Sequence, residues 1–302
     1  MKHLNVLILL LFPVGMWAEI HLPDSVWTFK KEGEHHHSEQ NEIWLSADRP
    51  GMGTGSEVLD RGDIQWETGF ECAHSLGAHL IGLPDALFRF GLHKRAELRL
   101  EYGGTLVVND KPNTDPPTLD EQAYMPSWLM VGSKILLWDH HGGSLDWKWV
   151  PRTALMANIG VPLTKAMADF MPVAGTIDLL FEHEVLEWLS IGYDVGAHWV
   201  DWAPAPDVFA SLCINFEPTD HLGLFIESYN IFDPDFQDEH GRYYTHCDIS
   251  MDFGLTYAVH PRVQLDAHAG FNLYDTEPLL SGPKNYVFAG LGVTWLIWHP
   301  NK

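Results

Sequence analysis

A run of histidines near the amino terminus is the first candidate for chemistry. His35, His36 and His37 are adjacent, and histidine-rich tracts often bind metal ions. Three neighbouring side chains cannot all face one ion from a regular helix or strand. We therefore interpret the run as a solvated loop and predict no metal site and no cofactor.

Histidine, serine and acidic residues could also form a hydrolase site, so we searched for such a set. Ser38 and Ser75 each follow a histidine, but both lie in or beside loops rather than on a shared strand face. No Gly-x-Ser-x-Gly elbow occurs. His198 and Asp194 share one face near the end of a predicted strand. A surface hydrolase stays the least favoured alternative, and we predict no catalytic residues.

Most other charged residues alternate with apolar residues in long stretches. The clearest stretch spans residues 247–273, where apolar residues occupy every second position on both sides of a turn at Val259–Arg262. Such alternation predicts strands with one apolar and one polar face. Strands in soluble domains have about five or six residues, whereas a tilted strand needs about nine to eleven to cross a bilayer. The stretch predicts a transmembrane hairpin.

Similar segments recur along the chain, at 64–72, 86–92, 96–102, 129–138, 146–161, 173–184, 188–199, 207–216, 221–232 and 286–298. Together they predict an all-β fold, a transmembrane antiparallel β-barrel of about 12 strands. We expect tight turns to alternate with longer loops, which include Gly103–Pro126 and Asp233–Gly241. A secreted β-sandwich or soluble barrel is the alternative, but neither has a reason to alternate loop lengths.

The polar faces would line the lumen. Its acidic candidates are Glu67, Glu71, Glu97, Glu101, Asp178, Glu182, Asp194, Glu227, Asp248, Asp252 and Asp266. Its basic candidates are Arg89, Arg95, Arg99, Lys134 and Arg152. Such a lining favours cations or neutral solutes over anions. Alternatively, ion pairs between these residues plug a narrow barrel.

A motif ahead of the first strand, Asp48-Arg49-Pro50, could fold into the lumen. Arg49 would then pair with lumen carboxylates. An Arg49→Ala change would test this hypothesis by its effect on stability and conductance.

Composition excludes one class of partner. The formal net charge of −23 repels nucleic acid, whose phosphates need basic partners. The 13 Trp, 15 Phe and 9 Tyr suit aromatic girdles at the two membrane interfaces. Cys72, Cys213 and Cys247 are too few and too scattered for a disulfide framework.

The amino terminus resembles a secretory signal peptide. Residues 1–18 have a basic start, a short apolar core and a plausible cleavage point after Ala18. An uncleaved anchor is the alternative, but the core is short for spanning. We predict a polar segment at 19–61, periplasmic or inserted in the lumen, and a barrel at 62–302. The predicted location is the outer membrane of a Gram-negative bacterium, and no strand indicates an oligomeric state.

Several pieces resemble a family of outer-membrane β-barrels labelled as putative meta-pathway phenol-degradation proteins, often called transporters. The matching pieces are Ala47–Pro50, Leu87–Leu92, Arg95–Arg99, Phe253–Tyr257, Val263–Asp266 and Phe288–Val293. The chain departs from the pattern in its His-rich leader and in its ending, Trp298–Lys302. The resemblance implies passage of hydrophobic aromatic compounds and carries over no catalytic residues.

These observations predict an outer-membrane barrel that allows passive transport of a small, hydrophobic or aromatic molecule through an acid-lined lumen. Its partners would be outer-membrane lipid and the solute. The alternative is a structural or partner-binding barrel with a closed lumen, whose two long loops would contact the partner.

Overall fold

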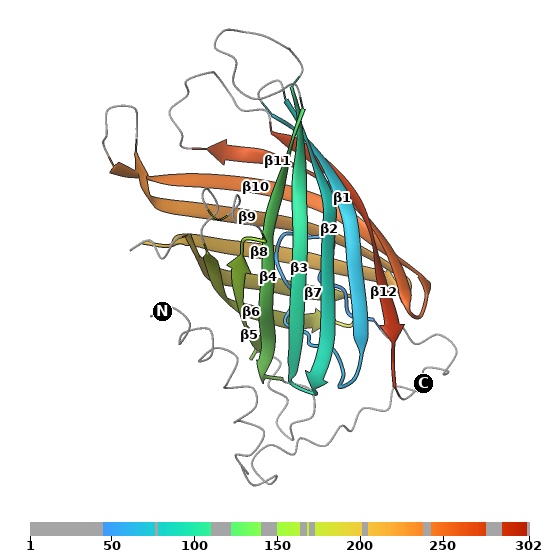
Figure 1. Ribbon diagram of the computed structural model, residues 1–302. Coiled ribbons are helices and arrows are strands. Elements are labelled where there is room, and N and C mark those ends of the chain that lie inside the picture. Colours follow the sequence, from blue (N-terminus) through green and yellow to red (C-terminus); the bar gives the residue numbers. More distant parts are fainter. Residues whose placement is uncertain are drawn as a thin grey trace, which may run out of the picture. The chain divides into compact units, whose positions relative to one another are not determined.

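The protein forms a closed antiparallel β-barrel in the computed structural model, which describes residues 45–75, 78–109, 122–139, 150–163, 168, 173–200, 205–237, 243–275 and 286–300. The strands are β1 (Ile64–Ser75), β2 (Ala78–His93), β3 (Ala96–Asn109), β4 (Gln122–Trp138), β5 (Arg152–Val161), β6 (Ala174–Leu186), β7 (Leu189–Val200), β8 (Asp207–Thr219), β9 (Leu222–Gln237), β10 (Tyr243–His260), β11 (Val263–Asp275) and β12 (Val287–Trp298). Each strand pairs with its sequence neighbours, and β12 closes the barrel against β1 (Figure 1).

This architecture confirms the predicted all-β antiparallel barrel of about 12 strands. Residues 36–139 and 148–302 belong to one compact unit, and the features below lie within it. The predicted signal peptide and the His35–His37 run lie outside the described residues. No helix of the described residues has the length and apolar character needed to cross a membrane.

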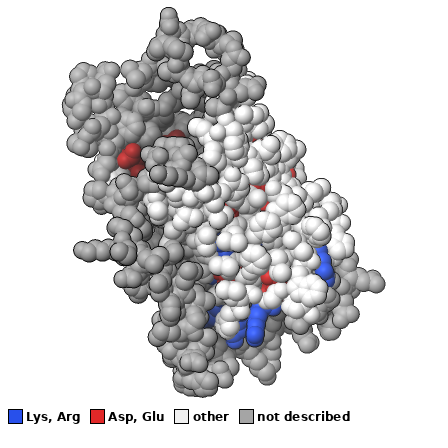
Figure 2. All heavy atoms as spheres, viewed as in Figure 1, with Lys and Arg blue, Asp and Glu red and all other residues white. Residues whose placement is uncertain are grey.

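The period-two patterns become the two faces of the wall. On β10, Phe253 and Leu255 are 54% and 42% exposed, whereas Asp252 between apolar neighbours is 1% exposed. Figure 2 shows one outer face that is mostly uncharged, with Lys and Arg gathered along its lower edge. An apolar outer face and a polar inner face are what a barrel needs when lipid surrounds it.

One end of the barrel, called here the tight-turn end, carries short connections at residues 94–95, 187–188, 220–221 and 261–262. The predicted alternation of loop lengths is wrong at two places. Only residues 76–77 join β1 to β2 at the opposite end, and the longer 139–151 connection lies at the tight-turn end.

Both predicted long loops are also shorter than expected, because strand pairing continues into them. Val107 on β3 pairs with Ala123 on β4, so strand replaces much of the Gly103–Pro126 loop. Asp233 likewise pairs with His246, and β9 continues to Gln237. Gly and Pro residues mark these stretches, and they conceal the alternation without ending the ladder.

Residues 45–61, called here the lumen segment, lead into β1 from the tight-turn end. Their backbone and side chains contact the inner faces of strands on opposite sides of the barrel. Gly91 permits part of this approach, because a Cβ there would collide with the backbone carbonyl of Asp60. The lumen segment therefore packs against the wall along much of its length.

Candidate functional site

Asp48 of the lumen segment lies among three cationic side chains. Lys134 donates to Asp48 Oδ1 at 2.8 Å, and Arg99 donates to the other carboxylate oxygen. The Arg89 guanidinium lies 3.5 Å from the same carboxylate. Burial alone would raise the pKa of Asp48, but Arg89, Lys134 and Arg99 together hold it well below its usual range. Asp48 is therefore ionised and anchors the segment.

Arg89 is completely buried and connects the strands of this side. Its Nε donates to Glu97 at 2.9 Å, and its Nη1 donates to Glu67 at 3.0 Å. Nη1 also donates to the carbonyl oxygen of Ser46 at 2.5 Å. A buried charge is tolerated when opposite charges and hydrogen bonds satisfy it, as they do here.

Lys134 and Arg152 hold the next part of the lumen segment. Lys134 donates to the carbonyl oxygens of Gly55 at 2.9 Å and Glu57 at 3.0 Å. Arg152 donates to the Glu57 carboxylate at 2.6 Å and lies 3.4 Å from Glu182. We call Arg89, Arg99, Lys134 and Arg152, on β2 to β5, the basic wall.

Across the lumen, the corresponding inner residues are acidic. We call Asp194, Glu227, Asp252 and Asp266, on β7, β9, β10 and β11, the acidic wall. Glu227 accepts hydrogen bonds from the backbone amides of Met52 at 2.7 Å and Gly53 at 2.8 Å. The acidic wall thus holds the segment chiefly through its amides rather than through cations.

Gly53 has no room for a side chain. A Cβ there would approach the Ser211 hydroxyl, the Glu227 carboxylate and Asp194 Oδ2, the last at 3.1 Å. Asp194 in turn accepts from the amide of Ser211 at 3.0 Å. Glycine therefore lets the segment backbone approach the carboxylates closely.

Arg49 is the residue of the segment that bridges to the acidic wall with a charge. Its Nε and Nη2 lie 3.4 Å from the two oxygens of Asp266, and its Nη1 pairs with Asp85. Burial lowers the pKa of Arg49, but Asp266 and Asp85 outweigh burial and raise it. Gly69 and Gly292 flank the guanidinium, and a Cβ at either would collide with it. Arg49 therefore joins the lumen segment to β2 and β11.

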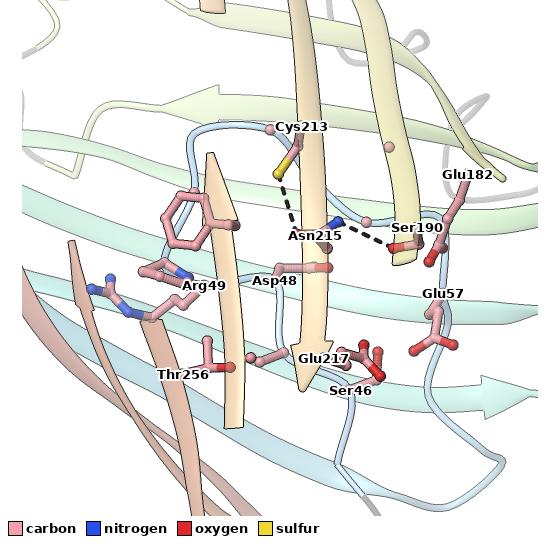
Figure 3. Close-up of a pocket in the computed structure, with 18 of the residues that line it drawn as sticks. Ser46, Asp48, Arg49, Glu57, Glu182, Ser190, Cys213, Asn215, Glu217 and Thr256 are labelled. Atoms are coloured by element: carbon pink, nitrogen blue, oxygen red, sulfur yellow. Dashed lines mark hydrogen bonds between the residues drawn. The ribbon is translucent and has the colours of Figure 1, made fainter. Parts of the chain in front are cut away.

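A cavity of about 400 Å³ lies between the lumen segment and the inner faces of β6 to β11 (Figure 3). Its lining carboxylates are those of Asp48, Glu57, Glu182, Asp194, Glu217, Asp220 and Glu227. Cys213 donates to Asn215 Oδ1 at 3.3 Å, and the Asn215 amide donates to Ser190 Oγ at 3.3 Å. Arg49 is the lining residue that carries a fixed positive charge.

The structure brings some sequence candidates together and separates others. Glu67, Arg89, Glu97, Arg99 and Lys134 meet around Asp48, as described above, whereas Glu101 is exposed. Arg95 precedes β3 and belongs to a tight turn rather than to the wall. Asp178 lies on β6 beside Gly196 of β7, where a Cβ would strike its carboxylate.

The remaining candidates lie on the side formed by β1, β10 and β11. Glu71 lies 3.2 Å from His268 Nε2. Asp248 accepts from the side-chain amide of Asn272 at 2.5 Å and from Ser250 at 3.1 Å. These acids therefore have polar partners other than the basic wall.

Sequence reasoning missed Glu57, Asp85 and His268 as members of the polar lining. Glu57 lies in a segment without alternation, so no pattern gives its direction. Asp85 and His268 fall on predicted inner faces, and that position was the signal available for them.

In the structure, the acidic neighbour of His198 is Asp207 rather than Asp194. His198 Nδ1 lies 3.9 Å from Asp207, and Asp194 bonds instead to backbone amides. Within the described ranges, no group of three or more His, Cys, Asp or Glu side chains could hold a metal ion.

The fold is that of outer-membrane β-barrels. An outer membrane channel from Pseudomonas putida F1 has a TM-score of 0.57 and 11% identity, over 82% of this chain and 98% of that chain. The NanC porin has a TM-score of 0.49 and 8% identity, over 76% and 98%. The CymD monoaromatic hydrocarbon channel has a TM-score of 0.38 and 9% identity, over 79% and 90%. No family model and no curated protein matches the sequence.

The comparison rests on the first of these structures, whose TM-score exceeds 0.5. At 11% identity, the likeness concerns the fold and not the solute. That structure is an outer membrane channel, which agrees with the coarser part of the family resemblance, an outer-membrane barrel.

Proposed function

We propose that the protein is an outer-membrane channel for passive movement of a small cationic or neutral solute. The supporting observation is the cavity between the lumen segment and the acidic wall, with its excess of carboxylates. The solute would diffuse down its own gradient. The proposal assigns no catalytic residue.

Charge balance supports the preference for cations. Each residue of the basic wall is close to carboxylates or backbone carbonyls that offset its charge. On the cavity side, Glu217 and Asp220 are exposed. Unpaired carboxylates around a confined space raise the local concentration of cations and repel anions.

The finer proposal concerns the solute. The family resemblance implies hydrophobic aromatic compounds, and Phe225 is an inward-facing aromatic residue that lines the cavity. A molecule with one apolar face and one polar or cationic group would suit such a lining. A purely anionic solute would be disfavoured.

The orientation follows from the lengths of the connections. Bacterial barrels place short turns in the periplasm, so the tight-turn end and the start of β1 would face the periplasm. Residues 1–18 would direct export, residues 19–61 would form the polar segment at or in the periplasmic mouth, and residues 62–302 would form the barrel. The membrane would be the outer membrane of a Gram-negative bacterium.

A second function is supported by the lumen segment itself. It bonds to both walls and occupies space that a solute needs, which favours a closed, structural or partner-binding barrel. The cavity therefore supports a narrow path for a solute, whereas the bonds of the lumen segment support a closed lumen.

Conductance of the folded protein in a planar bilayer separates the two functions. We expect small, steady current steps with cation selectivity in a salt gradient. Silence from protein that is folded and inserted would contradict the channel and favour the closed barrel. Anion selectivity would contradict the acidic path.

A further inference from the structure

Asp252 is a buried carboxylate whose oxygens lack hydrogen-bond partners. It lies on the inner face of β10 and is 1% exposed. Neither of its oxygens has a hydrogen-bond partner among the described residues. An isolated buried carboxylate is costly, so a group of this kind points to something that satisfies it.

The nearest acidic neighbour increases this cost. Asp252 pairs across the ladder with Glu227 of β9, so two carboxylates lie side by side. Glu227 receives hydrogen bonds from the Met52 and Gly53 amides, but Asp252 has no such support. Two neighbouring carboxylates repel each other, and a proton shared between them or a bound cation would relieve the repulsion.

Two aromatic rings lie over glycines that neighbour Asp252. A Cβ on Gly254, two residues along β10, would meet the ring of Phe225, with Cζ at 2.8 Å. Gly270 is the partner of Asp252 on β11, and a Cβ there would meet the ring of Phe288. Aromatic faces attract organic cations, because the ring quadrupole presents negative charge to them.

We propose that Glu227, Asp252 and the neighbouring rings form a binding site for a small organic cation that carries a protonated amine. Glu227 and Phe225 line the cavity, whereas Asp252 is not among its lining residues, so the ligand would reach Asp252 from the cavity by way of Glu227. This inference depends on the proposed function only in placing a solute in the lumen.

The chemistry distinguishes an amine from a metal ion. Calcium takes about six to eight oxygen ligands, and the described residues hold no group of three or more potential metal ligands. A protonated amine brings N–H donors, which Asp252 lacks among the described residues. Its alkyl part would lie against Phe225, and a cavity of about 400 Å³ accommodates a molecule of that size.

The experiment is calorimetric titration of the folded, detergent-solubilised protein with butylammonium chloride, compared with 1-butanol and magnesium chloride. We expect wild type to bind butylammonium and neither comparison compound. Asp252→Asn keeps the shape of the side chain and removes its charge, so affinity should fall about tenfold or more. Glu187→Gln, in an exposed tight turn, is the matched control and should bind as wild type does.

A second variant keeps the test decisive if Asp252→Asn does not fold. Phe225→Leu removes the ring and should weaken butylammonium binding by about two- to tenfold. Absence of butylammonium binding, magnesium binding in its place, or full affinity in Asp252→Asn would overturn the site. Conductance without butylammonium binding would overturn this inference alone. Binding without conductance would keep the site and contradict the channel.

Discussion

The basic wall and the acidic wall hold the same lumen segment by different means. Arg89, Arg99 and Lys134 bind it through the ionised Asp48 and through backbone carbonyls. Glu227 and Asp194 bind it through backbone amides. Positive side chains meet carbonyl oxygens and negative side chains meet N–H groups, so one short polar segment bonds to both walls.

The difference has a functional consequence. The charges of the basic wall are largely neutralised by carboxylates. On the acidic wall, Asp194 and Glu227 line the cavity, and the Asp252 oxygens have no hydrogen-bond donor among the described residues. We therefore expect the lumen to be closed beside the basic wall and to admit solute beside the acidic wall.

The largest expected effect is that of Asp48→Ala. Removing this carboxylate leaves Arg89, Arg99 and Lys134 with excess buried positive charge, so the free energy of unfolding should fall by about 3–5 kcal/mol. Denaturant unfolding of the barrel in detergent measures it. Asp220→Ala, at an exposed turn, is the control, and an equal loss there would contradict the anchoring role of Asp48.

Crowding on the acidic wall is tested by Gly53→Ala. The new methyl group would collide with Ser211 and Glu227, which should cost about 1–3 kcal/mol and loosen the segment. Gly55→Ala is the matched control, because a Cβ there would lie 3.7 Å from Asp48 Oδ1 in ordinary contact. Equal unfolding free energies for the two variants would show that the lumen segment can approach the acidic wall without a glycine at position 53.

The bridge between the walls is tested by Arg49→Ala. The change frees Asp85 and Asp266 and removes the guanidinium from the lumen, so bilayer conductance and cation selectivity should rise. We expect stability to fall by about 1–2 kcal/mol. Arg61→Ala, an exposed residue near the tight-turn end, is the control. Unchanged stability and conductance in Arg49→Ala would contradict the proposal that Arg49 bridges the lumen segment to the acidic wall.

The pH dependence should be the smallest effect near neutrality. The pKa of Asp48 is lowered from its ordinary value of 3.8, so its contribution is fully present above that value and is lost as pH falls through the folded-state pKa. The stability difference between wild type and Asp48→Asn should stay constant from about pH 7 to pH 4 and shrink below it. A difference that shrinks already near pH 6 would contradict the ion-paired state.

The fold could be predicted because alternation is a local signal. Residues 247–273 give the direction of each side chain directly, and twelve such segments give an antiparallel barrel. The ends of β3 and β9 could not be predicted, since Gly103, Gly104 and Pro234 interrupt the pattern while hydrogen bonding to the next strand continues.

The lining could be predicted only as a set of inward positions. Period two places Arg89, Glu97 and Lys134 on inner faces, but it does not say which carboxylate each cation meets. The contacts of Asp48 with three different strands depend on the path of the lumen segment, which has no periodicity.

The sequence by itself therefore determined the strands, the faces and the acidic excess, because each depends on neighbouring residues. Only the tertiary structure decided which carboxylates neutralise the cations of the basic wall, and that Asp252 has no hydrogen-bond donor among the described residues. Barrel closure brings together residues far apart in the chain, such as Arg49 and Asp266, and their distances decide which charges are neutralised.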